Sequence, residues 1–204
     1  MKDSKEHILK TSLLLFLQKG FKEVTMNEIV KSSGFSKGAF YHYFSSKEEV
    51  FKEVLDVYFG QMLHLDYDSL PSDSLQSFYK SILDIQQKKD TSIRSWYASY
   101  FKEEEEVPSS NLYYILFDAV RMLPDFRNKQ KTRLQNELEA WENVIKNAMD
   151  NGEIITNISA ENLAKQFVYT SDGIALHIVM MNSTNELTDE VTKVWDSLYK
   201  SLKK

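Results

Sequence analysis

Residues 25–48 read TMNEIVKSSGFSKGAFYHYFSSKE, and this stretch decides the fold. Thr25 and Glu28 stand three residues apart at the start of an apolar pattern, which is typical of a capping box at a helix N-terminus. Further on, Gly34 permits the left-handed conformation in which many helices end. The stretch therefore predicts a short helix over about residues 26–32.

A second short helix is expected directly after this turn. Ser36 is its N-cap candidate, and Phe40 and Phe44 stand four residues apart, so both should face the core. The helix is expected over about residues 37–44, and its outward side would carry Lys37, Ala39, Tyr41, His42 and Tyr43. Two short helices joined through a glycine turn form a helix-turn-helix, whose second helix enters the major groove of DNA.

Helical periodicity continues on both sides of this stretch. It predicts a helix over about 4–19 that ends at Gly20, and a second capping box, Ser46 to Glu49, that opens a helix reaching about 63–65. Further helices are expected at about 73–89, 91–105, 109–123, 125–149, 159–182 and 188–203. The fold class is therefore all-α: an N-terminal three-helix DNA-binding domain with a helix-turn-helix and a larger C-terminal helical bundle, about nine to ten helices in all.

The composition excludes several other classes of protein. The 204 residues include no cysteine, which excludes a disulfide framework, Cys-ligated zinc and thiol catalysis. The charged start and the short apolar runs predict neither a signal peptide nor a membrane span, and we expect a cytoplasmic protein. Net charge is −5, yet residues 1–50 hold 8 Lys against 6 Asp and Glu, so the N-terminal quarter is basic.

The positions that carry these patterns also stand in the register of a known family. They are Thr25-x-x-x-Ile29-Val30-x-x-Ser33-Gly34-Phe35-Ser36-Lys37-Gly38-Ala39-Phe40-Tyr41-His42-Tyr43-Phe44-x-x-Lys47-Glu48, which closely resembles the signature of TetR/AcrR-type transcriptional regulators. The resemblance covers about residues 4–55. Two positions depart from it: Met26 stands where the family often has a second Thr or a small residue, and Val30 replaces the usual alanine.

The resemblance implies that this segment binds double-stranded operator DNA. Lys and Asn side chains can donate to base edges, whereas hydroxyl, imidazole and ammonium groups can donate to phosphates. Lys37 opens the family's recognition helix, and Lys47 matches a position that reaches a phosphate. The implied DNA-binding residues are Thr25, Asn27, Ser36, Lys37, Gly38, Ala39, Tyr41, His42, Tyr43 and Lys47.

In the resembling family the rest of the chain encloses an effector. We therefore expect a helix-turn-helix DNA-binding domain over residues 1–48 and a helical ligand-binding and dimerisation domain over residues 49–204. Pockets for small molecules are lined by apolar and aromatic side chains, and the expected effector residues are Trp96, Tyr100, Tyr113, Tyr114 and Phe117. No Arg or Lys cluster lies among them, which disfavours a multiply anionic effector.

The two C-terminal segments, 159–182 and 188–203, carry apolar residues at helical spacing. The first is apolar nearly all round towards its end, so it must be covered on two sides. A buried core helix would explain this pattern, but the resemblance favours a four-helix homodimer interface. The expected interface residues are Phe167, Ser171, Ile174, Ile178, Trp195 and Leu198, and His177 is expected in the core or the interface.

The expected function is a ligand-responsive repressor whose homodimer binds a near-palindromic operator and is released by a small-molecule effector. A helical-bundle oxidase would need Glu-x-x-His pairs, and none of the four histidines has an acidic residue three positions before it. No nucleophile elbow, phosphate loop or zinc motif occurs either, so no catalytic residue, metal or cofactor is expected. The remaining alternative is a small-molecule-binding or scaffold protein without DNA binding.

Overall fold

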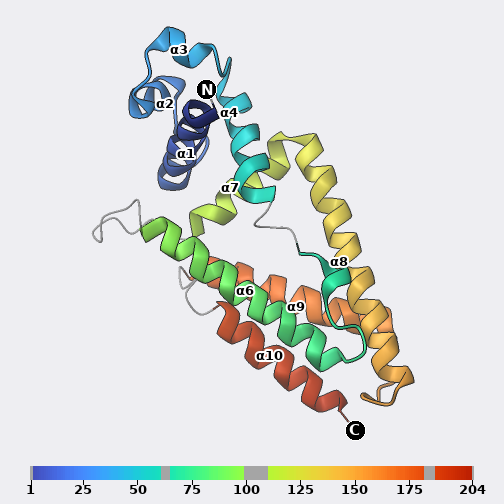
Figure 1. The fold of residues 1–204 in the computed structure, drawn as a ribbon. Coiled ribbons are helices and arrows are strands. Elements are labelled where there is room, and N and C mark those ends of the chain that lie inside the picture. The colour runs from blue at the N-terminus through green and yellow to red at the C-terminus, as the bar shows by residue number, and fades with distance from the viewer. Residues whose placement is uncertain (1, 61–64, 99–109, 182–186, 204) are drawn as a thin grey trace. The chain divides into compact units, whose positions relative to one another are not determined.

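The computed structural model describes residues 2–60, 65–98, 110–181 and 187–203 (Figure 1). Over these residues the only strand-like pairing is an isolated bridge between Ile154 and Lys203, and nine α-helices occur, which confirms the all-α class. None of the described helices combines the length and the apolar character needed to cross a membrane. The helices are α1 (Lys2–Lys19), α2 (Met26–Ser33), α3 (Lys37–Tyr41), α4 (Lys47–Val54), α6 (Leu75–Ala98), α7 (Ser110–Met122), α8 (Pro124–Asp150), α9 (Ala160–Met180) and α10 (Leu187–Leu202).

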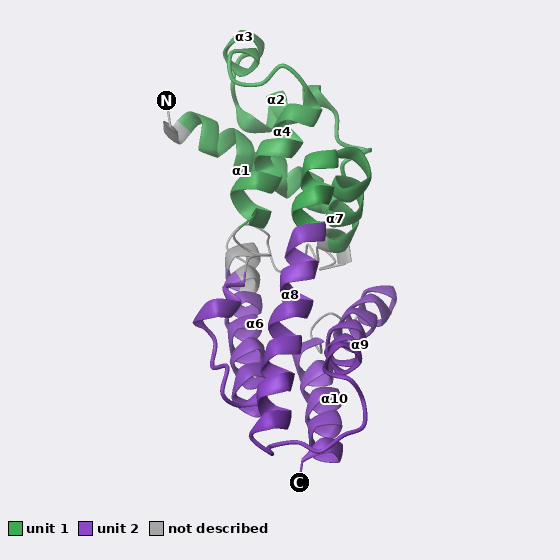
Figure 2. Cartoon of the chain, turned by 90° about the vertical axis from the view of Figure 1, so that its right-hand side faces the viewer, with its two compact units in different colours: residues 1–64, 107–130 green, residues 65–106, 131–204 purple. Residues whose placement is uncertain are grey.

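The chain divides into two compact units (Figure 2). Unit 1 comprises residues 1–64 and 107–130, and unit 2 comprises residues 65–106 and 131–204. Helix α8 therefore begins in unit 1 and continues into unit 2. The two units differ in their cores, and each is described by itself.

Unit 1 is built around phenylalanine rings from α1, α4 and the turn between α1 and α2. The ring centroids of Phe16 and Phe51 are 5.2 Å apart, and those of Phe21 and Phe51 are 4.4 Å apart. Phe40 and Phe44 are also buried, as their four-residue spacing predicts. These rings give the first four helices a common apolar core, which leaves the polar side of α3 on the surface.

Unit 2 has a core of large aromatic rings from α6, α8, α9 and α10. Trp141 lies at its centre, with ring centroids 5.1 Å from Phe78, 4.8 Å from Phe167 and 4.9 Å from Trp195. The indole Nε1 of Trp195 donates a hydrogen bond of 2.9 Å to the carbonyl of Phe167, so the buried polar group of the ring is satisfied. We call these four residues the aromatic core.

Two expected helix boundaries differ from the structure, and a third reaches residues that the structure does not describe. The predicted break near residue 90 is wrong, because α6 is continuous and the hydroxyls of Thr91 and Ser92 donate to carbonyls four residues earlier in the same helix. Helix α3 ends at Tyr41 instead of 44, because the amides of Tyr43 and Phe44 both turn back to the Phe40 carbonyl. After α4 the chain continues as a π-helical turn, Leu55–Phe59; the expected end at 63–65 reaches beyond the residues described there.

Candidate nucleic-acid interface

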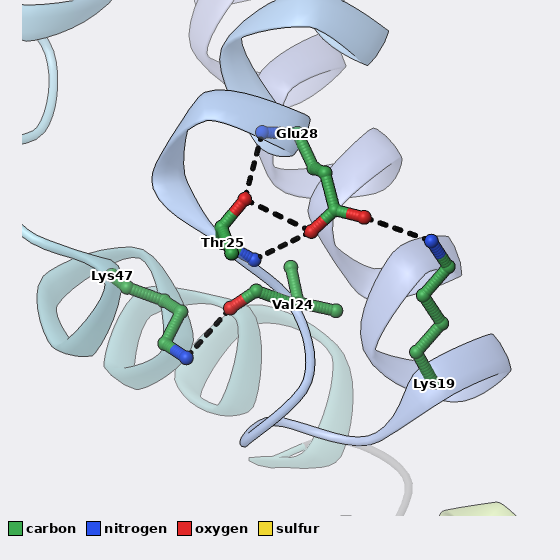
Figure 3. Close-up of polar contacts among 5 residues, drawn as sticks. All are labelled: Lys19, Val24, Thr25, Glu28 and Lys47. Atoms are coloured by element: carbon green, nitrogen blue, oxygen red, sulfur yellow. Dashed lines mark hydrogen bonds and ion pairs between the residues drawn. The ribbon is translucent and has the colours of Figure 1, made fainter.

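The N-terminus of α2 is held by the predicted capping box (Figure 3). The Glu28 amide donates to Thr25 Oγ1 at 3.2 Å, and the Thr25 amide donates to Glu28 Oε2 at 2.8 Å. The other carboxylate oxygen of Glu28 is 2.8 Å from Lys19 Nζ, at the end of α1. The hydrogen bond from Lys19, followed by those from Thr25, lowers the pKa of Glu28 from 4.5 to about 2. The ion pair between Glu28 and Lys19 therefore links the N-terminus of α2 to the end of α1.

The turn between α2 and α3 is also fixed as the sequence predicts. Gly34 has φ 71°, in the left-handed region, and its amide donates to the Lys31 carbonyl. The ring of Phe35 lies 6.3 Å from that of Tyr43. Ser36 is the N-cap of α3, and its Oγ accepts from the Ala39 amide at 3.3 Å. Because that oxygen caps the helix, Ser36 has a structural role in addition to the DNA contact expected for it.

Helix α3 presents a polar and aromatic surface. The exposed residues of the helix are Lys37, Gly38, Ala39 and Tyr41. Directly after the helix, His42 is exposed and Tyr43 is half-buried. Lys37 Nζ lies 6.0 Å from the centre of the Tyr41 ring, within the range of a cation–π contact. Thr25, the N-cap of α2, and Asn27 in α2 are also exposed. We call Thr25, Asn27, Lys37, Gly38, Ala39, Tyr41, His42 and Tyr43 the α2–α3 face.

Lys47 is placed differently from the other expected DNA contacts. It is the first residue of α4, and its ammonium donates to the carbonyls of Phe21 and Val24 at 2.8 and 2.6 Å. The cap before it also departs from expectation: Ser46 Oγ accepts from the Glu49 amide, but the Glu49 carboxylate accepts from the amide and hydroxyl of Ser45. These hydrogen bonds from Ser45 lower the pKa of Glu49.

The described structure does not test the grouping of the expected effector residues. Tyr114 and Phe117 are more than half exposed on α7, and Tyr113 is half-buried there. Trp96 belongs to α6 in the other unit, but its side chain is outside the described part, as is the whole of Tyr100. The grouping of these five residues stays a prediction.

Three of the expected interface residues are buried within the described chain. Phe167 and Trp195 belong to the aromatic core, and Ile178 is only 6% exposed. Their side chains are covered within one chain, and their part in a contact with a second copy stays a prediction. Ile174 and Leu198 are half-buried against the core, and the hydroxyl of Ser171 donates to the Val168 carbonyl of its own helix.

A different face of α9 carries the exposed apolar side chains. Tyr169, Leu176 and Met180 are 55%, 50% and 78% exposed, and their spacings of seven and four residues place them along one side of the helix. Gly173 lies between them, and a Cβ there would meet no heavy atom within 4 Å. The sequence signal for this stripe was the apolar character of α9 on more than one face, which does not by itself tell the core side from the outer side.

Unit 2 also holds a group of partly buried titratable side chains that the sequence did not point to. The phenol of Tyr67 is hydrogen-bonded to Glu137, and Arg133 Nη1 lies 3.5 Å from Glu137 Oε2. Burial raises the pKa of Tyr67, Glu137 and Asp172 above their ordinary values. These residues come from the turn before α6, from α8 and from α9, so only the fold brings them together.

The capped helices, the glycine turn and the exposed second helix together define a helix-turn-helix protein. Residues 8–54 match the sequence profile described as "Bacterial regulatory proteins, tetR family". Over this segment the chain is similar to the TetR family.

Named relatives agree with this assignment. The HTH-type transcriptional regulator YfiR of Bacillus subtilis is 27% identical over 186 residues, which is 85% of this chain and 82% of that protein. The repressor NemR of Escherichia coli is 48% identical over 46 residues, 22% of this chain and 23% of NemR. The matches to two further B. subtilis regulators, YerO and YuxN, span only about a fifth of those proteins, at 22% and 21%.

Solved structures share the fold over the whole chain. The crystal structure of reduced E. coli NemR has a TM-score of 0.57 and 22% identity, covering 95% of this chain and 97% of that one. A TetR transcription regulator from Haloarcula marismortui has a TM-score of 0.65 at 16% identity, with both chains covered completely. Because both identities are below 25%, these structures show a shared fold and no more. The shared fold extends beyond residues 8–54.

Proposed function

We propose that this protein is a DNA-binding transcriptional regulator that acts as a homodimer, represses from a near-palindromic operator and is released by a small-molecule effector. The observation that carries the proposal is the α2–α3 face, a capped helix pair whose outward side is polar, aromatic and exposed. Such a face can donate to phosphates from Lys37 and Tyr41 and to base edges from Asn27.

Gly38 supports the presence of a partner at α3. Its φ is not in the left-handed region, and a Cβ built on it would meet no heavy atom within 4 Å. The free chain therefore has no need of glycine there, although glycine weakens a helix relative to alanine. A surface that approaches the backbone closely, such as base edges in a groove, gives the residue a purpose.

The exposed stripe of α9 supports a homodimer. Contiguous apolar side chains on a surface mark contact sites, and a two-fold contact places the same stripe of both copies together. Gly173 lets two such helices approach closely at its position. We therefore assign the dimer contact to Tyr169, Gly173, Leu176 and Met180, in place of the buried residues expected from sequence.

We assign the binding site for the effector to the part of the chain that follows the helix-turn-helix, residues 49–204. The functional division after residue 48 stays part of this proposal. Binding sites combine apolar walls with a few polar groups of shifted pKa, and the pair of Tyr67 and Glu137 is of this kind. An effector that stabilised a conformer with a different separation of the two DNA-binding helices would need a coupling of only about 1–3 kcal/mol.

Selection from random duplex DNA tests the proposal. The full chain should enrich a near-palindrome whose half-sites are centred about one helical turn apart, or a small multiple of it, because two recognition helices related by a two-fold axis read the two halves. If the protein enriches no sequence and retains no duplex at low salt, the DNA-binding proposal is wrong and the small-molecule-binding alternative is favoured.

A further inference from the structure

The side chain of Lys47 donates its hydrogen bonds to backbone carbonyls of the same chain. Its ammonium donates to the carbonyls of Val24 at 2.6 Å, Phe21 at 2.8 Å and Lys22 at 3.4 Å. An ammonium group has three donors and no acceptor, so these three bonds use all of them. The same nitrogen lies 4.3 Å from the centre of the Phe21 ring, which adds a cation–π contact.

The three carbonyls belong to the segment between α1 and α2. They lie outside both helices, so helical hydrogen bonds cannot satisfy them. The side chains of Phe21 and Val24 are buried, and the bonds from Lys47 to their carbonyls are partly buried. Lys47 thus supplies donors at a place where polar backbone groups are only partly accessible to water.

We propose that Lys47 is a positioning residue for DNA binding, which fixes the 21–24 segment and with it the N-terminus of α2, instead of donating to a phosphate. The proposal rests on the proposed function. Val24 directly precedes Thr25, the N-cap of α2, so a bond to the Val24 carbonyl holds the cap on the side opposite to Glu28 and Lys19 (Figure 3).

The two roles of Lys47 differ in their dependence on salt. A lysine that neutralises a phosphate steepens the plot of log affinity against log salt concentration by about 0.9 for each phosphate. A lysine that only orients α2 changes the affinity at every salt concentration by the same factor. A phosphate contact would also require the ammonium to leave carbonyls that it already binds.

The first measurement uses the free full-length protein. Lys47→Met keeps the aliphatic stem over Phe21 but removes the donors. Amide hydrogen exchange should become faster at Glu28 and Ile29, whose amides bond to the side chain and the carbonyl of Thr25. Lys52→Met removes an exposed lysine from the same helix and should leave these amides unchanged. Unchanged exchange in Lys47→Met would overturn the proposal.

The second measurement uses the operator recovered by selection, at several salt concentrations and at a temperature where the variants are fully folded. Lys47→Met should bind about 10-fold more weakly than the unaltered protein with the same salt slope. Lys37→Met should show a slope shallower by about 0.9 if its lysine contacts a phosphate. A shallower slope in Lys47→Met would establish a phosphate contact instead, and full affinity would show that the bonds to the carbonyls do not matter for binding.

Lys47→Arg covers the case in which Lys47→Met does not fold. It keeps the charge, but a planar guanidinium does not match three carbonyls arranged around a point. Positioning predicts weaker binding with an unchanged slope, whereas a phosphate contact predicts nearly full affinity and would overturn the proposal. If the unaltered protein binds no DNA, the proposed function fails, while the exchange measurement still reports separately whether Lys47 fixes the start of α2.

Discussion

The helix-turn-helix segment and the aromatic core of unit 2 are held together in different ways. In the first, the deciding contacts join residues three apart, such as Thr25 with Glu28 and Ser36 with Ala39. In the second, the deciding contacts join rings far apart in the chain, such as Phe78 with Trp141. Hydrogen bonds between residues close in sequence fix the course of the backbone while burying little surface. Large rings bury much surface, but the local sequence does not determine which other rings they contact.

The largest expected effect comes from the aromatic core. Trp141→Ala should lower the free energy of unfolding by about 3–5 kcal/mol, because it leaves a cavity among Phe78, Phe167 and Trp195. Urea unfolding followed by circular dichroism measures the loss. Phe117→Ala is the matched control: this ring is 57% exposed, so its removal should change stability by no more than about 0.5 kcal/mol. Equal losses in both variants would contradict the assignment of the core.

A smaller effect is expected at the exposed stripe of α9. Leu176→Asp should weaken the dimer by on the order of 2 kcal/mol, about 30-fold, because a charged group would be buried between two copies. Sedimentation equilibrium measures the change. Ile155→Asp introduces the same charge at a residue that is 63% exposed outside the helices, and it should leave the dimer intact. A monomeric unaltered protein, or a dimer insensitive to Leu176→Asp, would exclude this interface.

The smallest effect on stability is expected in the helix-turn-helix segment, where it should have the opposite sign to the effect on binding. Gly38→Ala should stabilise the free protein by up to about 1 kcal/mol, because alanine favours the helix and the Cβ has open space. The same methyl should weaken operator binding if a base edge approaches the α3 backbone. Thermal unfolding and operator titration give the two numbers. A variant that gains stability and binds as tightly as before would show that no close approach occurs at Gly38.

Local patterns in the sequence were sufficient for the caps and the turn of the helix-turn-helix, although they did not predict where α3 ends. The N-caps Thr25 and Ser36, the left-handed Gly34 and the buried Phe40 and Phe44 are all where the spacing predicts them. Each of these features is signalled in the sequence by residues no more than four positions apart. The resemblance to the family added the expected role of this segment.

The rest depended on contacts that no local pattern contains. Helical periodicity identified Phe167 and Trp195 as apolar positions, but only the packing of α9 against α10 shows that they are covered within one chain. The bonds from Lys47 to carbonyls 23 to 26 residues earlier were equally invisible. The same holds for the pair of Tyr67 and Glu137, which are brought together from distant segments.

Operator titration of Tyr41→Ala, with the salt dependence of the unaltered protein, tests the central claim most directly. If the exposed side of α3 contacts the duplex, affinity should fall linearly with the logarithm of salt concentration, and the variant should bind more weakly by about 1–3 kcal/mol while unfolding like the unaltered protein. A flat salt response together with full affinity of Tyr41→Ala would contradict the claim.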